Sequence, residues 1–398
     1  MNVRVLSFAP ARIAVIAAIT AFLTTCAGSA ENATDAAAQS SGMSRFETRF
    51  GITARYEADY ADAHDEAVSV RVPEVFELAN IAFAITDYGR EHPFRVFKDG
   101  AYYDEVMAHF GPYSDHPLVE KIEFSDKRIG DYYEWRTASL AYRFEGSELT
   151  AGSPYRPTEE ATGWFHDQLE LIEDFAETTG FREFYAEHAE LYDSQIASYE
   201  ERVPVRRMWD WLDAQFPAAD GAYDAYVIVF SPLIYASHNT IRFEKDTFSE
   251  CIMVVGGPDL LAGRTNDERL EEALLSRHLF TEIDHNYVNP LSRQYEVRIA
   301  RALSDLDTWN GQDGYRSPQA TFNEYVTWAA FLLYAQEHYD GEVVEAASRY
   351  TVQSMEKGRK FLRFGDFVNR LSALWASRDP DETLSDLYPD MIGWFDAR

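Results

Sequence analysis

The sequence predicts an α+β protein that is mainly helical and contains a small mixed sheet. Amphipathic stretches with helix-start and helix-stop residues fill most of the chain, whereas β-branched and aromatic runs are concentrated after Gly221. The 398 residues are 46% hydrophobic and 15% aromatic, which is enough apolar material for one large domain or for two or three smaller ones. This composition excludes global disorder.

The charge balance narrows the classes of partner. The chain has 36 Lys+Arg and 67 Asp+Glu, which gives a formal net charge of −31 at pH 7. Binding to nucleic acid, or to an anionic membrane through basic residues, needs a basic face that such a chain can hardly assemble. We therefore expect no nucleic-acid partner, and contact with a membrane only through a lipid anchor.

Residues 1–30 are expected to be a signal peptide. Arg4 and Arg12 precede an apolar stretch, Ile13 to Leu23, that is shorter than the roughly 20 residues needed to span a bilayer. Two processing sites compete. Cleavage after Gly28-Ser29-Ala30 would release a soluble protein, whereas a lipobox ending at Cys26 would leave a lipid-anchored one. Both predict export, to the periplasm, to the outer membrane as a lipoprotein, or out of the cell.

Residues 31–44 are rich in Ala, Ser, Thr and Asn and are expected to form a flexible tether. The region 45–220 that follows is expected to be mainly helical. Its first 26 residues alternate weakly and predict one or two strands, and Pro73-Glu74 opens a helix that ends near Gly89. A helix over 102–110 and amphipathic segments over 160–216 complete this region.

In the region 221–398 the predicted secondary structure changes from mainly helical to strands followed by helices. Ala225–Phe230 and Cys251–Val255 predict two strands, and the residues between them are expected to form a third strand or a long hairpin loop. Cys251 is interpreted as a buried small hydrophobe. A helix is expected from Asn266 to the Asn289-Pro290 pair, followed by helices near 291–305, 320–338, 343–376 and 381–396.

The helix ending at Asn289 carries the most informative pattern in the chain. At 100° per residue, His278, Glu282 and His285 fall within about 60° of one another, and Thr281 lies beside them. In the zinc-peptidase motif His-Glu-x-x-His, the two imidazoles bind the metal and the Glu activates water. This chain instead has Thr281-Glu282-x-x-His285, so the first histidine of that motif is absent.

Further motifs support a family resemblance. They are Val72-Pro-Glu-Val-Phe-Glu-Leu78, the helix with Tyr102-Tyr103, Phe110-Gly-Pro-Tyr-x-x-His116-Pro117 and His285-x-x-x-Asn289-Pro290. With them the chain, from about 70 to about 340, resembles a group of exported bacterial proteins known as domain of unknown function 4932 (DUF4932).

The resemblance implies a zincin-like metallopeptidase core. Glu282 then matches the general base, His285 the second metal ligand, Glu324 the third ligand, and Thr281 the missing first ligand. An edge strand at about 251–255 would run beside the central helix and pair with an extended peptide, so a peptide or protein substrate is the implied partner. Tyr287, Tyr325 and Asn289 are the candidate substrate-binding residues.

Three alternatives remain open for this site. In the first, His278 replaces the lost ligand, so that His278, His285 and Glu324 hold zinc while Glu282 stays the base. In the second, Glu282 is itself a ligand with His285 and Glu324. In the third, zinc is lost and the fold persists as a binding or structural module of the cell envelope. The expected function is accordingly an exported zincin-like metal-dependent peptidase, with the inactive module as the alternative.

Overall fold

The computed structural model describes residues 50–218, 223–245, 248–261, 265, 267–311, 315 and 317–397. The predicted signal peptide, Cys26 and the tether over 31–44 lie outside these residues. The structure is mainly helical with small sheets, so the α+β fold class is confirmed. Within the described part of the chain, none of the helices is long and apolar enough to cross a bilayer.

The described residues form two compact units. The first, called here the sheet unit, contains residues 50–213 and 223–287, and the second, the helical unit, contains residues 214–218 and 288–397. These bounds differ from the division expected near residue 221, because the strands that follow it belong with the N-terminal elements. The division falls within two helices, α12 (Val205–Gln215) and α13 (Glu268–Gln294).

The sheet unit contains all the described strands. They are β1 (Ile52–Ala54), β2 (Val68–Arg71), β3 (Tyr142–Glu145), β4 (Glu148–Ala151), β5 (Tyr155–Pro157), β6 (Ala225–Ser231), β7 (Asn239–Lys245) and β8 (Phe248–Gly256). Its α-helices, with α12 and α13 shared at the division, are α3 (Ala58–His64), α4 (Glu74–Ala84), α5 (Asp87–Glu91), α6 (Ala101–Phe110), α7 (Pro117–Lys121), α8 (Ile129–Ala138), α9 (Leu169–Thr179), α10 (Phe181–Glu187) and α11 (Ala189–Arg202).

The main sheet has the order β2-β6-β8-β7. Strands β2, β6 and β8 are parallel, and β7 pairs antiparallel with β8. The expectation that Cys251–Val255 is an edge strand is therefore wrong, because β7 occupies the edge and β8 lies between β6 and β7. The sequence of β7, Asn-Thr-Ile-Arg-Phe-Glu-Lys, explains this place, since polar residues alternate with Ile241 and Phe243 as in a strand buried on one face.

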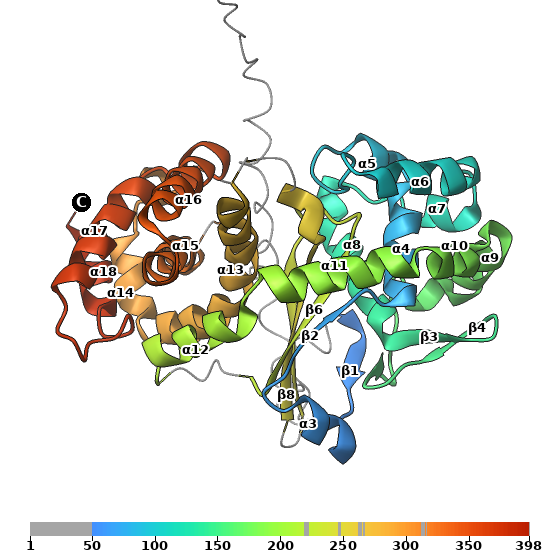
Figure 1. Ribbon diagram of the computed structural model, residues 1–398, viewed down its shortest axis with the longest axis horizontal. Coiled ribbons are helices and arrows are strands. Elements are labelled where there is room, and N and C mark those ends of the chain that lie inside the picture. The colour runs from blue at the N-terminus through green and yellow to red at the C-terminus, as the bar shows by residue number, and fades with distance from the viewer. Residues whose placement is uncertain are drawn as a thin grey trace, which may run out of the picture. The chain divides into compact units, whose positions relative to one another are not determined.

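Helices cover both faces of this sheet. Successive residues of a strand point to opposite faces. On one face, Asn286 of α13 donates a hydrogen bond to Cys251 of β8, with Nδ2 and Sγ 3.4 Å apart. On the other face, Tyr155 of β5 stacks on Phe243 of β7. Helix α4 packs on β6, and helix α11 passes beside β2 (Figure 1).

Cys251 is buried in the apolar core of the sheet unit, as expected. Burial raises the pKa of its thiol to about 11, so the thiol stays protonated at neutral pH. This supports the interpretation of Cys251 as a small buried hydrophobe.

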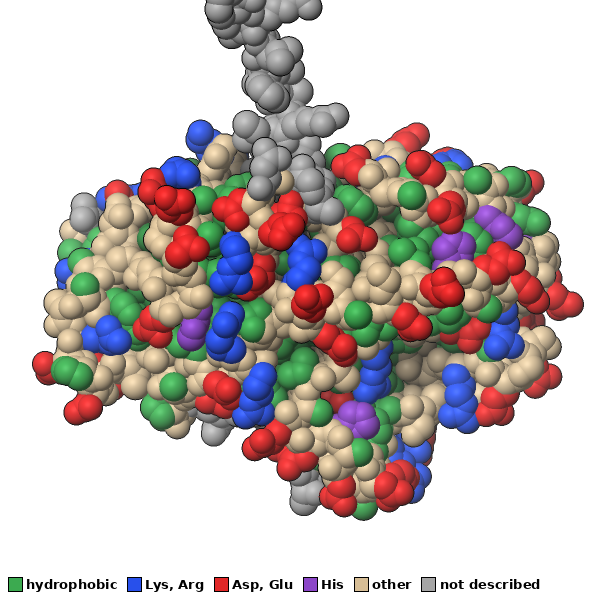
Figure 2. All heavy atoms as spheres, viewed as in Figure 1, with side chains coloured by type: hydrophobic (Ala, Val, Ile, Leu, Met, Phe, Trp, Pro, Cys, Tyr) green, Lys and Arg blue, Asp and Glu red, His purple; other side chains and the backbone are tan. Residues whose placement is uncertain are grey.

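The acidic residues of the chain are visible at the surface, where Asp and Glu side chains are spread over the face seen in Figure 2.

The helical unit is built around one buried helix, α15 (Pro318–His338). All its residues from Thr321 to Ala335 are buried. The helices around it are α14 (Glu296–Ala302), α16 (Gly341–Gln353), α17 (Phe364–Ser377) and α18 (Tyr388–Asp396). They confirm the expectation of a helical C-terminal region, although α16 and α17 are separate helices where one segment over 343–376 was expected.

Two further expectations were wrong. The helix α13 does not end at Asn289-Pro290 but continues to Gln294 with Pro290 inside it. A proline removes one N–H from the helix ladder, and here the buried surroundings of α13 hold the helix together beyond that point. The amphipathic helical segment expected from residue 160 contains no α-helix before α9 begins at Leu169.

Candidate functional site

Helix α13 turns one polar stripe toward β7, and two residues of this stripe, His278 and Glu282, are candidate site residues from the sequence. His278, Glu282 and Asn286 are spaced four residues apart and share one stripe of the helix. All three are nearly completely buried. Sequence reasoning therefore grouped His278 with Glu282 correctly, but their partners come from the strand beside them.

Alternate residues, from His238 just before β7 into the strand itself, contact this stripe one by one. The ring of His238 lies edge-on to His278, with ring centroids 5.5 Å apart. One step along, Thr240 donates a hydrogen bond from Oγ1 to Glu282 Oε2 over 2.7 Å. A further step along, Arg242 donates from Nε to the Oδ1 of Asn286. Two residues of a strand advance by about the same length as four residues of a helix. The successive contacts therefore show that β7 and α13 run side by side over this length.

The two histidines are held in their neutral form. Burial, followed by the charge of Arg136, lowers the pKa of His238 to about 4. Burial, followed by Arg277 and His238, lowers the pKa of His278 well below its ordinary value. The Nε2 of His278 lies 3.3 Å from the Arg277 guanidinium. A guanidinium at that distance competes with a metal cation for the same imidazole nitrogen.

The position that corresponds to the first zinc ligand serves the helix itself. Thr281 is buried and donates a hydrogen bond from Oγ1 to the backbone oxygen of His278, over 3.1 Å. This is the local side-chain-to-backbone bond that threonine commonly makes within a helix. His285, the expected second ligand, is half-buried on the next turn.

The expected third ligand lies in the helical unit. Glu324 of α15 forms an ion pair with Arg359, with Oε2 and Nη1 2.8 Å apart, and the two side chains are only 3% and 1% exposed. Trp328 donates from Nε1 to the same carboxylate oxygen over 3.1 Å. The Arg359 guanidinium also binds the hydroxyl of Tyr315 and lies over the Trp328 ring. Glu324 is therefore neutralised by a buried arginine.

The candidate substrate-binding residues also have structural partners. Tyr287 is buried and donates its hydroxyl to Asp213. Tyr325 is buried in the helical unit and donates to the backbone oxygen of Trp309 over 2.9 Å. Asn289 accepts a hydrogen bond from Asn323 over 2.7 Å. Burial raises the pKa of both tyrosines, which keeps their hydroxyls protonated as donors.

The candidate metal ligands predicted from the sequence do not fit a zinc site. Among the residues that the structure describes, no three His, Cys, Asp or Glu side chains are grouped so that they could hold a metal ion. A zincin site needs three protein ligands around one ion. The reason for the misfit lies in the partners just described, since Arg277 faces His278 and Arg359 neutralises Glu324.

Sequence reasoning missed the polar residues of β7 and of the position just before it. His238, Thr240 and Arg242 form a polar alternation between two apolar strands. That alternation was the available signal for a strand that faces a polar helix stripe. The sequence predicts either a third strand or a long hairpin loop here, and only a strand presents alternate residues to one neighbour.

The fold and site define an α+β protein whose central helix faces an antiparallel edge strand through three polar pairs. Comparisons with known proteins find no match, either among family models, among curated proteins or among solved structures. The resemblance to domain of unknown function 4932 therefore stays a prediction that depends on the motifs alone.

Proposed function

We propose that this chain is a non-catalytic, zincin-like binding module of the cell envelope that takes an extended polypeptide along the open edge of β7. The observation that carries the proposal is the hydrogen bond from Thr240 to Glu282. In a peptidase the carboxylate of Glu282 would act on a metal-bound water. Here it is an acceptor for the edge strand, next to a threonine in place of the first ligand.

The charges around the other candidate ligands support the same proposal. A neutral His278 beside Arg277 and a Glu324 paired with Arg359 are both arranged as parts of a packed interior. Arg359 would lose its carboxylate partner if Glu324 turned to a metal, and Arg277 would lose its contact with His278. Removing the carboxylate from a buried ion pair costs several kcal/mol.

The place of β7 supports the polypeptide partner. It is an edge strand of the main sheet, so one side of its backbone pairs with no strand of that sheet among the residues that the structure describes. An extended peptide adds to such an edge through main-chain hydrogen bonds, and alternate side chains set specificity. The polar pairs to α13 fix β7 in place, which lowers the entropy cost of pairing with it.

The first prediction concerns metal content. After dialysis against trace zinc, the purified untagged protein is expected to hold well below one zinc per chain by plasma mass spectrometry and to leave labelled casein intact. Thr281→His is expected to raise the zinc content, because it restores the missing imidazole of the motif. Near one zinc per wild-type chain, lost in His285→Ala, would overturn the proposal in favour of the peptidase.

The second prediction concerns the edge strand. Reduced and alkylated lysozyme is a permanently unfolded, basic chain that complements the net charge of −31. Hydrogen exchange of this protein with the probe bound is expected to slow at the backbone of Asn239–Lys245. The opposite edge strand, Val68–Arg71, serves as the internal control and is expected to keep its exchange rate. Unchanged exchange in β7, or equal slowing of both strands, would contradict pairing at this edge.

A further inference from the structure

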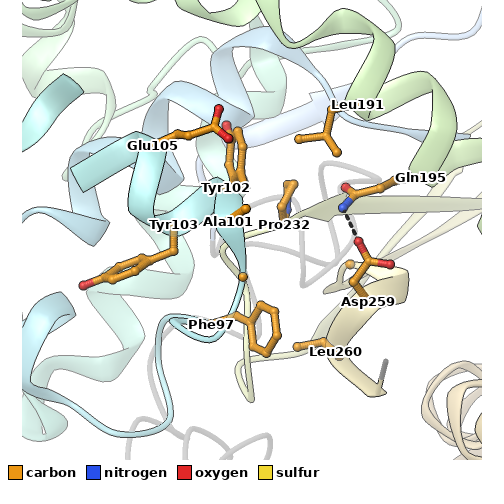
Figure 3. A pocket seen from close by; sticks show the side chains of 12 residues that line it. Phe97, Ala101, Tyr102, Tyr103, Glu105, Leu191, Gln195, Pro232, Asp259 and Leu260 are labelled. Carbon is orange, nitrogen blue, oxygen red and sulfur yellow. Dashed lines mark hydrogen bonds between the residues drawn. The ribbon is translucent and has the colours of Figure 1, made fainter. Parts of the chain in front are cut away.

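A pocket of about 170 Å³ lies in the sheet unit at the ends of two parallel strands (Figure 3). Pro232 follows the last residue of β6, Gly257 follows the last residue of β8, and both line the pocket. Ligands of open sheets bind outside the carboxyl ends of parallel strands, where the connecting segments diverge. The pocket is thus in the part of the fold where a ligand site is expected.

The walls of the pocket are largely aromatic and aliphatic. Phe97, Leu191 and Leu260 contribute apolar surface. The ring of Tyr102 is fixed from behind, because its hydroxyl donates to the buried Glu77 over 2.8 Å and lies 2.7 Å from the hydroxyl of Tyr192. A rigid apolar wall of this kind suits an apolar ligand body.

Two polar side chains of the pocket, Gln195 and Asp259, meet at one end, and Glu105 lies at the other (Figure 3). Gln195 of α11 donates from Nε2 to Asp259 over 2.8 Å (Figure 3). Gln195 is only 6% exposed, and its carbonyl oxygen Oε1 has no hydrogen-bond partner among the described residues. A Cβ built on Gly257 would lie 3.9 Å from that oxygen, so the missing side chain leaves room beside an unpaired acceptor.

The charge of the lining is of one sign. Asp259 and Glu105 both line the pocket, and Asp259 is exposed at its polar end. The described lining includes no Lys or Arg. Buried acceptors without donors are costly, so a ligand that brings N–H donors gains both hydrogen bonds and charge pairing here.

We propose that this pocket binds a ligand with an apolar body and a primary ammonium group. The ammonium donates to Asp259 and to the free carbonyl of Gln195, and the body lies between Phe97, Tyr102 and Leu260. A cavity of about 150 Å³ holds a benzene-sized molecule, so the volume suits one small ring or a short aliphatic chain. This inference is independent of zinc and of the edge of β7.

Benzylamine is the probe that tests the pocket. Titration calorimetry on the mature protein is expected to give one saturable site. Benzyl alcohol, which has the same ring and no charge, is expected to bind about tenfold more weakly or not at all, because it lacks the charge-assisted hydrogen bonds. Asp259→Asn keeps the acceptor for Gln195 and is expected to weaken benzylamine binding by a similar factor.

Two control variants locate the site. Asp193→Asn, on the exposed side of the same helix α11, changes the net charge equally and is expected to leave binding unchanged. Gly257→Leu adds volume to the pocket without changing any charge and is expected to abolish binding. A melting temperature close to wild type confirms that each variant is folded. Equal binding by wild type and Asp259→Asn, full binding by Gly257→Leu, or no saturable binding at all would each overturn the proposal.

Discussion

Replacing Glu324 by alanine is expected to destabilise the protein by about 3–5 kcal/mol, measured as the free energy of unfolding in urea. The reason is the arginine that the substitution leaves behind. Arg359 is 1% exposed and pairs with Glu324 at 2.8 Å. Without the carboxylate, a fully buried guanidinium keeps the hydroxyl of Tyr315, the Met355 sulfur and the faces of nearby aromatic rings, none of which carries a compensating negative charge.

A second substitution separates this loss of a buried pair from a general loss of packing. Arg359→Met in the Glu324→Ala background removes the unpaired charge and is expected to recover a substantial part of the stability, because apolar replacements of buried ion pairs are often neutral. The exposed pair Glu345 and Arg349, on α16 of the same unit, is the matched control. Glu345→Ala is expected to change the free energy of unfolding by at most about 1 kcal/mol.

The same measurement bears on the role of Glu324. A structural glutamate predicts that chelators leave the unfolding midpoint of the wild-type protein unchanged. A metal-ligating glutamate predicts that chelators lower the wild-type midpoint toward that of Glu324→Ala, because metal binding stabilises only the folded state. The second result would contradict the role assigned here to the pair with Arg359.

Local patterns in the sequence predicted local structure correctly. The spacing of apolar residues after Pro73 predicted the helix that is now α4, and the 100° rule placed His278 and Glu282 on one stripe of α13. These predictions succeed because helix periodicity depends on residues within a few positions of one another. The β-branched runs at Ala225 and Cys251 identified β6 and β8 for the same reason.

The hydrogen-bond and ion-pair partners of the side chains could not be predicted from local sequence patterns. Glu324 is paired with Arg359, which lies 35 positions further along the chain, and nothing near either residue indicates the other. Glu282 was interpreted as a base because its neighbours resembled a motif, whereas its hydrogen-bond partner Thr240 comes from a different strand. Strand order is equally non-local, and this is why the edge position was assigned to β8 rather than β7.

The buried acid Glu77 is a third side chain whose surroundings could not be predicted from the local sequence. The helix expected from Pro73-Glu74 to about Gly89 ends at Ala84, and every residue of α4 from Val75 to Ala84 is buried, the acid included. Glu77 is 0% exposed and accepts a hydrogen bond from Tyr102. Burial raises its pKa to about 7, while hydrogen bonds from Ser231 and Tyr102 hold it below a still higher value.

Glu77→Gln is expected to stabilise the protein at pH 8 by about 3 kcal/mol while changing its stability little at pH 4.5. The unfolded chain loses the Glu77 proton near its ordinary pKa of 4.5, and the folded chain loses it only near 7. Between these values the folded state binds more protons, so wild-type stability is full below pH 4.5 and falls as the pH rises to about 7. Glutamine has no proton to lose, and it keeps an acceptor for Tyr102.

Urea unfolding at half-unit pH steps checks this prediction through the difference between the two proteins. That difference is expected to grow from pH 4.5 to about 7 and then level off. Tyr102→Phe supplies the opposite case, because losing the hydroxyl donor raises the pKa of Glu77 further and extends the decline of stability to higher pH. A constant difference between wild type and Glu77→Gln across this range would mean that the buried carboxyl titrates alike in both states. The pocket proposed to bind an ammonium ligand would then have a charged acid behind one wall, since Glu77 accepts the hydrogen bond of the pocket-lining Tyr102.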